Sequence, residues 1–291
     1  MLRWLFGKGA RRARVERELA AIAPECWSRV MSRYAFLQGL TAEEEAALLH
    51  RSAWLLASKG FSGVHGLLVS EEMKLAIAVQ AALPIMKLDP RLYEGWTEIV
   101  LYPGGFLIPR SDVDENGVVH EYVEEAAGEA WEGGPLILSW EDCGPDQDDV
   151  NVVIHEFVHK LDLYQGEADG IPWFGLHGAG ISVKRWQAVL QASYEDFCSR
   201  VEAVEAAIPA DLDPESPAAE PWYAALPLDA YAAADPAEFF AVSSESFFVN
   251  PAALAACYPD WYQLLAAFYR QDPLTRLGMV RTAPSPQTPE P

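Results

Sequence analysis

Apolar and polar positions in the first part of the chain repeat with the 3.6-residue period of an α-helix. The stretch TAEEEAALLHRSAWLLASKG begins at Thr41, which can cap a helix, and Glu44 follows three residues later, the pattern of a capping box. The stretch SEEMKLAIAVQAALPIM predicts a second helix, which begins after Ser70 and ends near Pro84. Both belong to a predicted helical lobe that spans residues 1–90.

The pattern then changes to that of β-strands. The segment Trp96–Pro109 is rich in β-branched and aromatic residues and is broken by Pro-Gly-Gly, which predicts two strands or a hairpin. The alternating VVHEYVE and the short apolar run within Gly133–Asp142 predict two further strands. More helices are predicted around Trp186–Ala206, from Asp235 onwards and around Trp261–Arg270.

These elements predict a mainly helical α+β fold, in which a small mixed sheet packs on the helix of the candidate site. Residues 91–279 are expected to contain that site and to pack with the helical lobe as one compact unit. The segment 206–222 is acidic and rich in proline, so it is expected to be an exposed loop. Residues 282–291 lack core-forming residues, and a disordered tail is expected over 280–291.

Composition narrows the classes of function. The chain has 291 residues and a formal net charge of −22, and an acidic surface repels the phosphate backbone of nucleic acids. No apolar run approaches the roughly 18 residues of a membrane span, and the basic N-terminus lacks the apolar stretch of a signal peptide. The four cysteines are far apart and form no C-x-x-C pair, so reduced, buried thiols are expected. A cytoplasmic protein that binds neither membranes nor nucleic acids is therefore predicted.

The stretch DDVNVVIHEFVHKLDLY predicts a buried helix, because apolar residues cover most of its circumference. Asp148 or Asp149 can cap this helix. His155 and His159 are four residues apart on one face, about 5–6 Å apart at Cβ, so two imidazoles can bind one metal ion. Glu156 projects beside them and can act as general base towards a metal-activated water.

The H-E-x-x-H pattern alone does not decide the question, because chance produces it in about one chain in a hundred of this composition. The alternative is an ordinary helix that happens to contain two histidines. The apolar surroundings favour the metal site, because polar groups without partners are costly to bury. A shared ion with its bound water would satisfy His155, Glu156 and His159 together.

A catalytic zinc site also needs a third protein ligand and an open position. The remaining histidines are isolated along the sequence and are not favoured: His50, His65, His120 and His177. A carboxylate further along the chain is the better candidate.

The stretch DAYAAADPAEFFAVSSESFF predicts another buried helix, with Asp235 as N-cap and proline at the first helical position. Glu238 and Glu245 lie seven residues apart on one face of it. Glu238 is predicted as the ligand, and Glu245 as the group that orients a ligand histidine through its other N–H. The reverse assignment is the alternative, and an ordinary capping box would also explain Glu238. Asp162 lies on the stripe of the two histidines and is assigned, with Glu245, to the residues that surround the ligands.

At these residues the chain resembles the Mlc titration factor A family of zinc peptidases, which is related in its catalytic part to the anthrax lethal factor peptidase. VIHEFVHKLD and DAYAAADPAEFFAVSSESFF are the most specific stretches, and GEAWEGGPLILSWED and YRQDPLTRL are similar as well. The resemblance covers about residues 25–277. It implies a zincin-like catalytic part with one zinc ion per chain on His155, His159 and Glu238, and Glu156 as the base.

The resemblance also favours Tyr231 as a hydroxyl that stabilises the oxyanion of the reaction. The alternative is a packing tyrosine just before a helix, and without the resemblance nothing in the sequence singles Tyr231 out. The acidic segment 206–222 looks longer here than in the family, which leaves substrate preference open, and it leaves open whether this segment covers the site.

A peptide or protein substrate is predicted, without a choice between aminopeptidase and endopeptidase. The strand GPLILSW is expected to be an edge strand that aligns the peptide, and an interior strand is the alternative. Family members are described as inactivating a glucose-responsive transcriptional repressor, so a non-catalytic regulatory protein that sequesters such a repressor is the second hypothesis. A purely structural zinc domain is disfavoured, because Glu156 would then have no role beside the metal.

Overall fold

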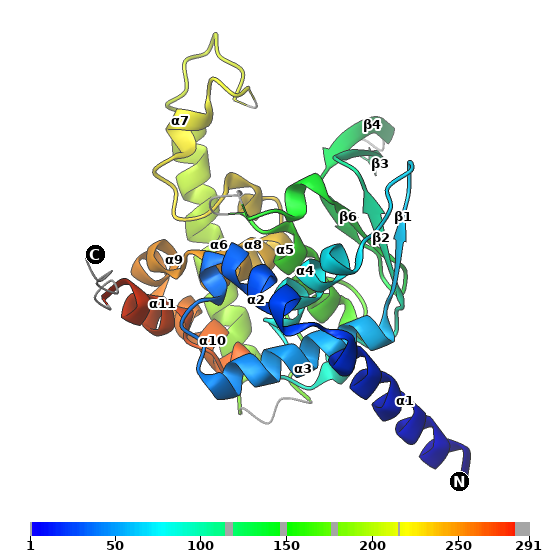
Figure 1. Ribbon diagram of the computed structural model, residues 1–291. Helices are drawn as coiled ribbons and strands as arrows, with labels where there is room; N and C mark the ends of the chain where they lie inside the picture. Colours follow the sequence, from blue (N-terminus) through cyan, green and yellow to red (C-terminus); the bar gives the residue numbers. More distant parts are fainter. Residues whose placement is uncertain (1, 114–118, 146–149, 176–179, 215, 283–291) are drawn as a thin grey trace, which may run out of the picture.

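Helices form most of the molecule, and a small mixed sheet lies along one side of it (Figure 1). The structure is a computed structural model that describes residues 2–113, 119–145, 150–175, 180–214 and 216–282. The helices are α1 Leu2–Ala21, α2 Pro24–Arg33, α3 Ala42–Ser58, α4 Glu71–Ala82, α5 Val152–Asp162, α6 Val183–Glu205, α7 Glu220–Tyr223, α8 Pro236–Val249, α9 Pro251–Cys257, α10 Pro259–Tyr269 and α11 Pro273–Thr282. The strands are β1 Gly60–Gly63, β2 Glu98–Tyr102, β3 Phe106–Val113, β4 Val119–Ala126, β5 Gly128–Ala130 and β6 Leu136–Ser139. The predicted α+β fold, mainly helical with a small mixed sheet, is confirmed.

The main sheet has the strand order β1-β2-β6-β5. Strands β1, β2 and β6 are parallel, with Ile99 opposite Leu136, and β5 runs antiparallel to β6, with Gly128 opposite Leu138. Strand β6 is therefore interior, and the expectation that GPLILSW forms an edge strand is wrong. A short apolar strand has the same sequence pattern at the edge and in the interior of a sheet. Only the strands that pair with it determine which position it takes.

The sequence predicted strands near β2, β3 and β4 but missed β1 and β5. The segment Trp96–Pro109 contains β2 and the start of β3, which lie in different sheets and do not form a hairpin with each other. Strand β3 instead pairs with β4 in a separate antiparallel sheet. Strand β1 lies within the predicted helical lobe and pairs with β2. The main sheet thus joins the two predicted parts of the chain, whose division remains a prediction.

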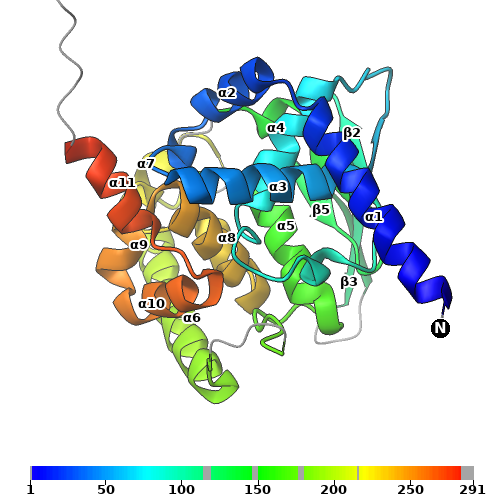
Figure 2. The same ribbon diagram turned by 60° about the horizontal axis from the view of Figure 1, so that its bottom comes forward.

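Local capping fixes the start of the N-terminal helices, as predicted. Thr41 Oγ1 accepts the N–H of Glu44 at 3.2 Å, and the Glu44 carboxylate accepts the N–H of Thr41 at 3.0 Å. Ser70 Oγ accepts the N–H of Met73 at 3.2 Å. Helix α3 then packs against α1 and α4 (Figure 2), which builds the helical layer beside the sheet.

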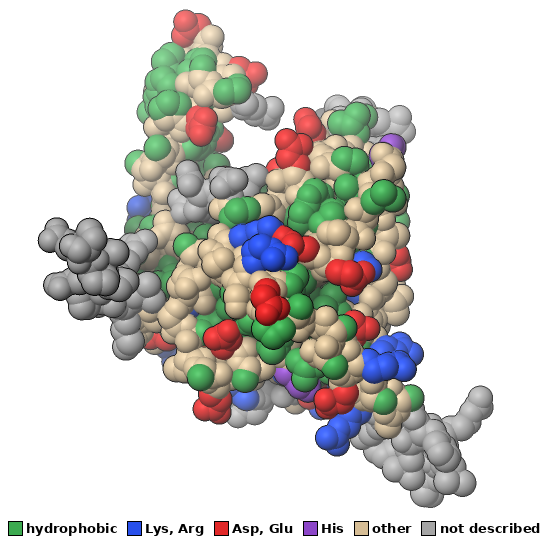
Figure 3. All heavy atoms as spheres, viewed as in Figure 1, with side chains coloured by type: hydrophobic (Ala, Val, Ile, Leu, Met, Phe, Trp, Pro, Cys, Tyr) green, Lys and Arg blue, Asp and Glu red, His purple; other side chains and the backbone are tan. Residues whose placement is uncertain are grey.

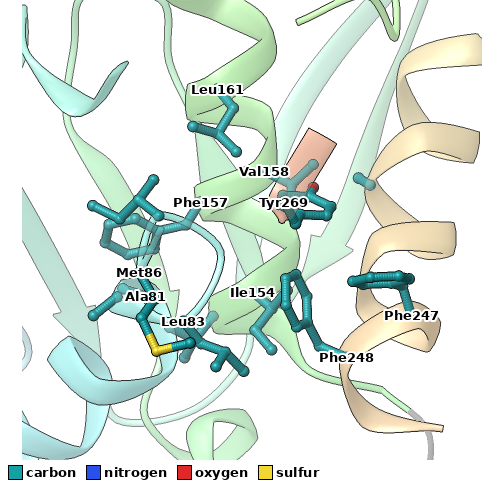
Figure 4. Close-up of a cluster of buried hydrophobic side chains, with 14 of the residues drawn as sticks. Ala81, Leu83, Met86, Ile154, Phe157, Val158, Leu161, Phe247, Phe248 and Tyr269 are labelled. Carbon is teal, nitrogen blue, oxygen red and sulfur yellow. The ribbon is translucent and has the colours of Figure 1, made fainter. Parts of the chain in front are cut away.

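Helix α5 lies within the hydrophobic core and is buried on nearly all sides. Figure 4 shows Ile154 of α5 in one cluster with Phe248 of α8 and Tyr269 of α10. Phe157 packs edge-on against Tyr93, with 5.1 Å between the ring centroids. Each fully buried large apolar side chain of this kind contributes about 1.5–3 kcal/mol to stability. Tight packing on several sides fixes the position of α5 and of the polar residues on it.

The described residues of the segment 206–222, namely 206–214 and 216–222, project from the body together with the end of α6, at the upper left of Figure 1. It contains turns and the short helix α7. In Figure 3 this arm stands apart from the rest of the surface, with hydrophobic and acidic side chains on it. The predicted tail 280–291 begins within α11, and residues 283–291 lie outside the described part of the chain.

All four cysteines are free thiols, but they are not all buried as expected. Cys143 is buried and Cys257 is exposed, whereas Cys26 and Cys198 are partly buried. Among the described residues, no helix has the length and apolar character that a membrane crossing requires.

Lys59, at the end of α3, is a buried cation. Its Nζ donates to the carbonyls of Tyr93 at 2.5 Å and Trp96 at 2.7 Å, and it lies 3.6 Å from the centroid of the Trp96 ring. Burial, helped by the nearby charge of Lys160, lowers the pKa of Lys59 to about 7.

Replacing this lysine should change how stability depends on pH. The ordinary pKa of 10.5 applies to Lys59 in the unfolded chain, so between about pH 7 and pH 10 the unfolded chain binds more protons than the folded one. The free energy of unfolding of the wild type minus that of Lys59→Met should therefore increase as pH rises through this range. Urea unfolding at pH 7, 8 and 9 measures the difference, with Lys74→Met on the surface as control. Parallel pH profiles for wild type and Lys59→Met would contradict the assigned pKa.

Candidate metal centre

Helix α5 begins later than the sequence suggested. Its N-cap is Asn151, whose Oδ1 accepts the N–H of Ile154 at 2.8 Å. The prediction of Asp148 or Asp149 as the cap is wrong, and both residues lie outside the described part of the chain. Asn151 is buried, so this cap ties the start of the helix to the core.

Three donor atoms from α5 and α8 converge. His155 Nε2 and His159 Nε2 are 3.0 Å apart, and Glu238 Oε2 lies 3.1 Å from the first and 3.3 Å from the second. Helix α8 begins after Asp235, as predicted, and the Asp235 carboxylate accepts the N–H of Glu238 at 2.9 Å. Within the described part of the chain, His155, His159 and Glu238 are the one group of three side chains found with metal-ligand spacing.

The arrangement fits a tetrahedral metal ion. Zinc bonds of about 2.0–2.1 Å place neighbouring ligand atoms about 3.3 Å apart in a tetrahedron. The observed separations of 3.0–3.3 Å are close to that value. Burial alone would raise the pKa of Glu238, but hydrogen bonds and charge from His155 and His159 lower it below its usual range, so the carboxylate is ionised. Two imidazoles and a carboxylate are a common donor set for such an ion.

Glu245 lies on the other side of the His155 ring. Its Oε1 is 2.5 Å from His155 Nδ1, and its Oε2 accepts the N–H of Asn151 at 2.8 Å. A carboxylate on Nδ1 keeps a proton on that nitrogen and turns the Nε2 edge of the ring towards His159 and Glu238. Glu238 and Glu245 thus lie at opposite ring nitrogens of the same imidazole, and the ligand role of Glu238, favoured from the sequence over its reverse, remains a prediction.

Glu156 is buried beside the cluster, with only 5% of its surface exposed. Burial raises the pKa of Glu156, and His155 and His159 oppose that rise. Its Oε2 forms no hydrogen bond with the described residues, and the side chain lines the cavity in front of the histidines. A buried carboxylate with a free oxygen and a raised pKa is suited to accept a proton.

Asp162 has a different setting from the one its place on the histidine stripe suggested. Its Oδ2 accepts the N–H of Gly170 at 2.7 Å, and burial raises the pKa of Asp162 to about 7. Gly170 has a φ of +76°, and a side chain there would meet the carbonyl of Pro236 at the start of α8. Asp162 thereby fastens the loop after α5 against the helix that contains Glu238.

Tyr231 stands at the rim of the site. It lies in the 3₁₀ turn η5, Ala230–Ala233, which Asp229 caps by accepting the Tyr231 N–H at 2.8 Å. The side chain is 48% exposed, and its ring centroid is 6.3 Å from that of His155. Its position is therefore that of a pocket residue accessible to a ligand.

The cluster lies in a cavity of about 500 Å³. One wall consists of the six consecutive residues 125–130, where β4 leads into the edge strand β5. This wall was not predicted from the sequence, although its run of small residues, Ala126, Ala127 and Gly128, is a sign of close backbone approach. None of the lining residues comes from the described part of 206–222.

The other histidines contribute nothing to this cluster as far as the structure describes them. His50 and His65 are exposed. The side chain of His120 and the whole of His177 lie outside the described part of the chain.

Comparison with known proteins agrees with this geometry. Residues 8–270 match the model of the glucose-regulated metallo-peptidase family M90. The chain is 35% identical to the Mlc titration factor A of Serratia proteamaculans over 256 residues, which is 87% of this chain and 90% of the relative. It is 34% identical to the Mlc titration factor A of Cronobacter sakazakii over 266 residues, 90% of this chain and 92% of the relative. With that of Yersinia pestis it shares 33% identity over 244 residues, 83% of each.

The family model spans residues 8–270, which include both helices of the cluster, and the relatives align with 83–90% of the chain. A cavity that contains two histidines, a third acidic ligand candidate and a buried glutamate is what a metallopeptidase requires. The chain therefore belongs to the glucose-regulated metallo-peptidase family M90.

Proposed function

We propose that this protein is a zinc-dependent peptidase, with zinc held by His155, His159 and Glu238. The observation that supports it most is the convergence of three donor atoms within 3.3 Å in a cavity that Glu156 also lines. A zinc ion bound there would polarise the scissile carbonyl and make a water molecule more acidic. The remaining chemistry belongs to residues of the chain.

Glu156 is proposed as the general base. Its carboxylate takes a proton from the attacking water and gives it to the leaving amine. Burial raises the pKa of Glu156, which helps the carboxylate both to accept the proton from water and to hold it until the amine leaves. Tyr231 is proposed to donate a hydrogen bond to the oxyanion of the tetrahedral intermediate, because its side chain lines the same cavity.

The peptide is proposed to lie along the cavity wall formed by residues 125–130. Strand β5 pairs with β6 on one side and is the last strand of the main sheet. A strand at a sheet edge can align an extended peptide through main-chain hydrogen bonds. The small side chains of Ala126, Ala127 and Gly128 leave the backbone of the wall accessible to such a peptide.

A second role in regulation is proposed from the relatives. Their name, Mlc titration factor A, indicates an interaction with the repressor Mlc. An Mlc-type repressor is therefore proposed as a partner of this chain, in the cytoplasm, through a surface that need not be the catalytic cavity. Sequestration of the repressor and hydrolysis of peptides can coexist. A substitution of Glu156 should distinguish them, because it should stop hydrolysis and leave repressor binding intact.

The first test is Glu156→Gln. Removing the base should lower kcat for peptide hydrolysis by about 10²- to 10⁴-fold, while about one zinc ion per chain is retained because Glu156 is not a ligand. Metal analysis and peptide hydrolysis are measured side by side, and repressor binding by calorimetry should be unchanged. Glu98→Gln, on strand β2 away from the cavity, is the control. Undiminished hydrolysis in Glu156→Gln would refute the base, and a wild type that neither contains nor takes up zinc would refute the peptidase.

Tyr231→Phe tests the oxyanion donor. Loss of one such donor should lower kcat by about 10²-fold with little change in KM, because the hydrogen bond forms in the transition state. Steady-state kinetics with Tyr102→Phe as control provide the measurement. If kcat stays at the wild-type level, Tyr231 has only a packing role.

Glu245→Gln tests the two assignments of the glutamates. An amide can offer only one oxygen, so one of the donors His155 Nδ1 and Asn151 N would face an NH₂ group. Zinc affinity should fall by about 10- to 100-fold, and further in Glu238→Gln, which removes a charged ligand. Competition with a chromogenic chelator measures both. A larger loss in Glu245→Gln than in Glu238→Gln would reverse the assignment.

A further inference from the structure

Gly128 approaches the side chain of Glu156 more closely than any other residue type could. A Cβ atom built on Gly128 would lie 2.5 Å from Glu156 Oε1, 2.6 Å from its Cγ and 2.8 Å from its Cδ. Non-bonded carbon atoms normally keep about 3.5–4.0 Å apart. Any side chain at this position would therefore overlap the whole outer part of Glu156.

The backbone of Gly128 gives no other reason for glycine. Its φ is not in the positive range that favours this residue, and it sits in a strand, paired with Leu138. Glycine weakens a strand interior, and its presence there often marks a place where other groups come close. Here the close group is the buried carboxylate of Glu156.

Neither partner can retreat without disturbing the site. Glu156 is 95% buried, so the space open to its carboxylate is the cavity in front of His155 and His159. Strand β5 is held from the other end, because Lys160 Nζ of α5 donates to the carbonyls that follow it, of Trp131 at 2.5 Å and of Gly134 at 3.1 Å. Strand and helix are thus fastened to each other on both sides of the contact.

We propose that Gly128 is a positioning residue for Glu156: the missing side chain sets how far the carboxylate stands from the edge strand and from the metal ligands. The role in catalysis rests on the proposed peptidase function. The contact between Gly128 and Glu156 does not depend on that function. The contact and its role in catalysis are therefore tested separately.

The contact is tested by a double-mutant cycle on stability, with the full chain and one equivalent of zinc. Gly128→Ala should lower the melting temperature by about 5 °C, because overpacking of a closed site is destabilising. Most of that loss should disappear when Gly128→Ala is introduced into Glu156→Ala, which removes the overlapped atoms. The same loss in both backgrounds would overturn the proposal, whatever the chain catalyses.

The double-mutant cycle remains informative if a variant fails to fold. If Gly128→Ala does not fold but the double variant does, the overlap with Glu156 is the cause and the proposal stands. If neither folds, the added methyl group meets something other than Glu156 and the proposal falls.

The catalytic consequence is tested by kinetics and by structure. A displacement of the base by about 1 Å can lower the rate by about 10²-fold, so kcat of Gly128→Ala should fall by about 10- to 100-fold with KM and zinc content unchanged. A crystal structure of the variant should show the Glu156 carboxylate moved towards the histidines. Wild-type kcat in folded Gly128→Ala, or an unmoved carboxylate, would overturn the positioning role.

Gly60→Ala is the matched control. A Cβ on Gly60 would lie 2.6 Å from Glu98 Oε2, an equally close approach to a glutamate, on the opposite edge of the same sheet. Glu98 is partly exposed and can move into solvent, so kcat should stay at the wild-type value. A wild type without peptidase activity would refute the proposed function alone, while the stability cycle would still decide the contact.

Discussion

The packing of helix α5 against helix α8 is the constraint on which the candidate site depends. The Nε2 atoms of His155 and His159 project from one helix, and Glu238 Oε2 from the other, and all three lie within 3.3 Å of one another. Imidazole and carboxylate side chains are short, so a shift of either helix by one ångström would separate them beyond the reach of a single ion. Apolar contacts of both helices with the aromatic core oppose such a shift.

Buried hydrogen bonds extend this constraint to the N-terminal helices. Glu245 of α8 accepts the N–H of Asn151, and Asn151 Nδ2 donates to Gln80 Oε1 of α4 at 2.8 Å. Gln80 Nε2 then donates to the hydroxyl of Tyr34 at 3.0 Å. Each of these groups would cost about 1–3 kcal/mol if buried without its partner. The network therefore favours one position of α5 relative to α4 and α8. Directional hydrogen bonds specify this position more narrowly than apolar packing alone.

The parts of this structure that the sequence predicted are those whose energetics are local. Thr41 and Glu44 contact each other within one helical turn, and Pro236 fixes the start of α8 one residue after its cap, so both helix starts were predicted correctly. The candidate cluster was found because i, i+4 spacing on a helix already brings His155 and His159 together.

What the sequence did not predict depends on contacts between distant segments. Strand β6 is interior because β5, three residues of Gly-Glu-Ala with little strand propensity, pairs along its side. Asn151 caps α5 because Gln80 and Glu245 also contact it, and neither is near in sequence. The sequence favoured Glu238 over Glu245 as the ligand but kept the reverse as an alternative, because both share a helix face and only the crossing of α5 and α8 determines which one meets Nε2.

The same crossing concentrates an electrostatic cost in one place. Glu156, Glu238 and Glu245 are carboxylates with little solvent around them, and burial of a charge is costly unless it is paired. Two histidines offset part of that cost, whereas the apolar residues of α5 and α8 stabilise the helices that enforce the arrangement. A cation bound at the centre would interact favourably with all three carboxylates at once, and any ligand that binds only the folded state stabilises it by mass action. The fold therefore maintains, through its core, a cluster of charges that a bound metal ion would stabilise, and this is the state in which Glu156 is proposed to act as the base.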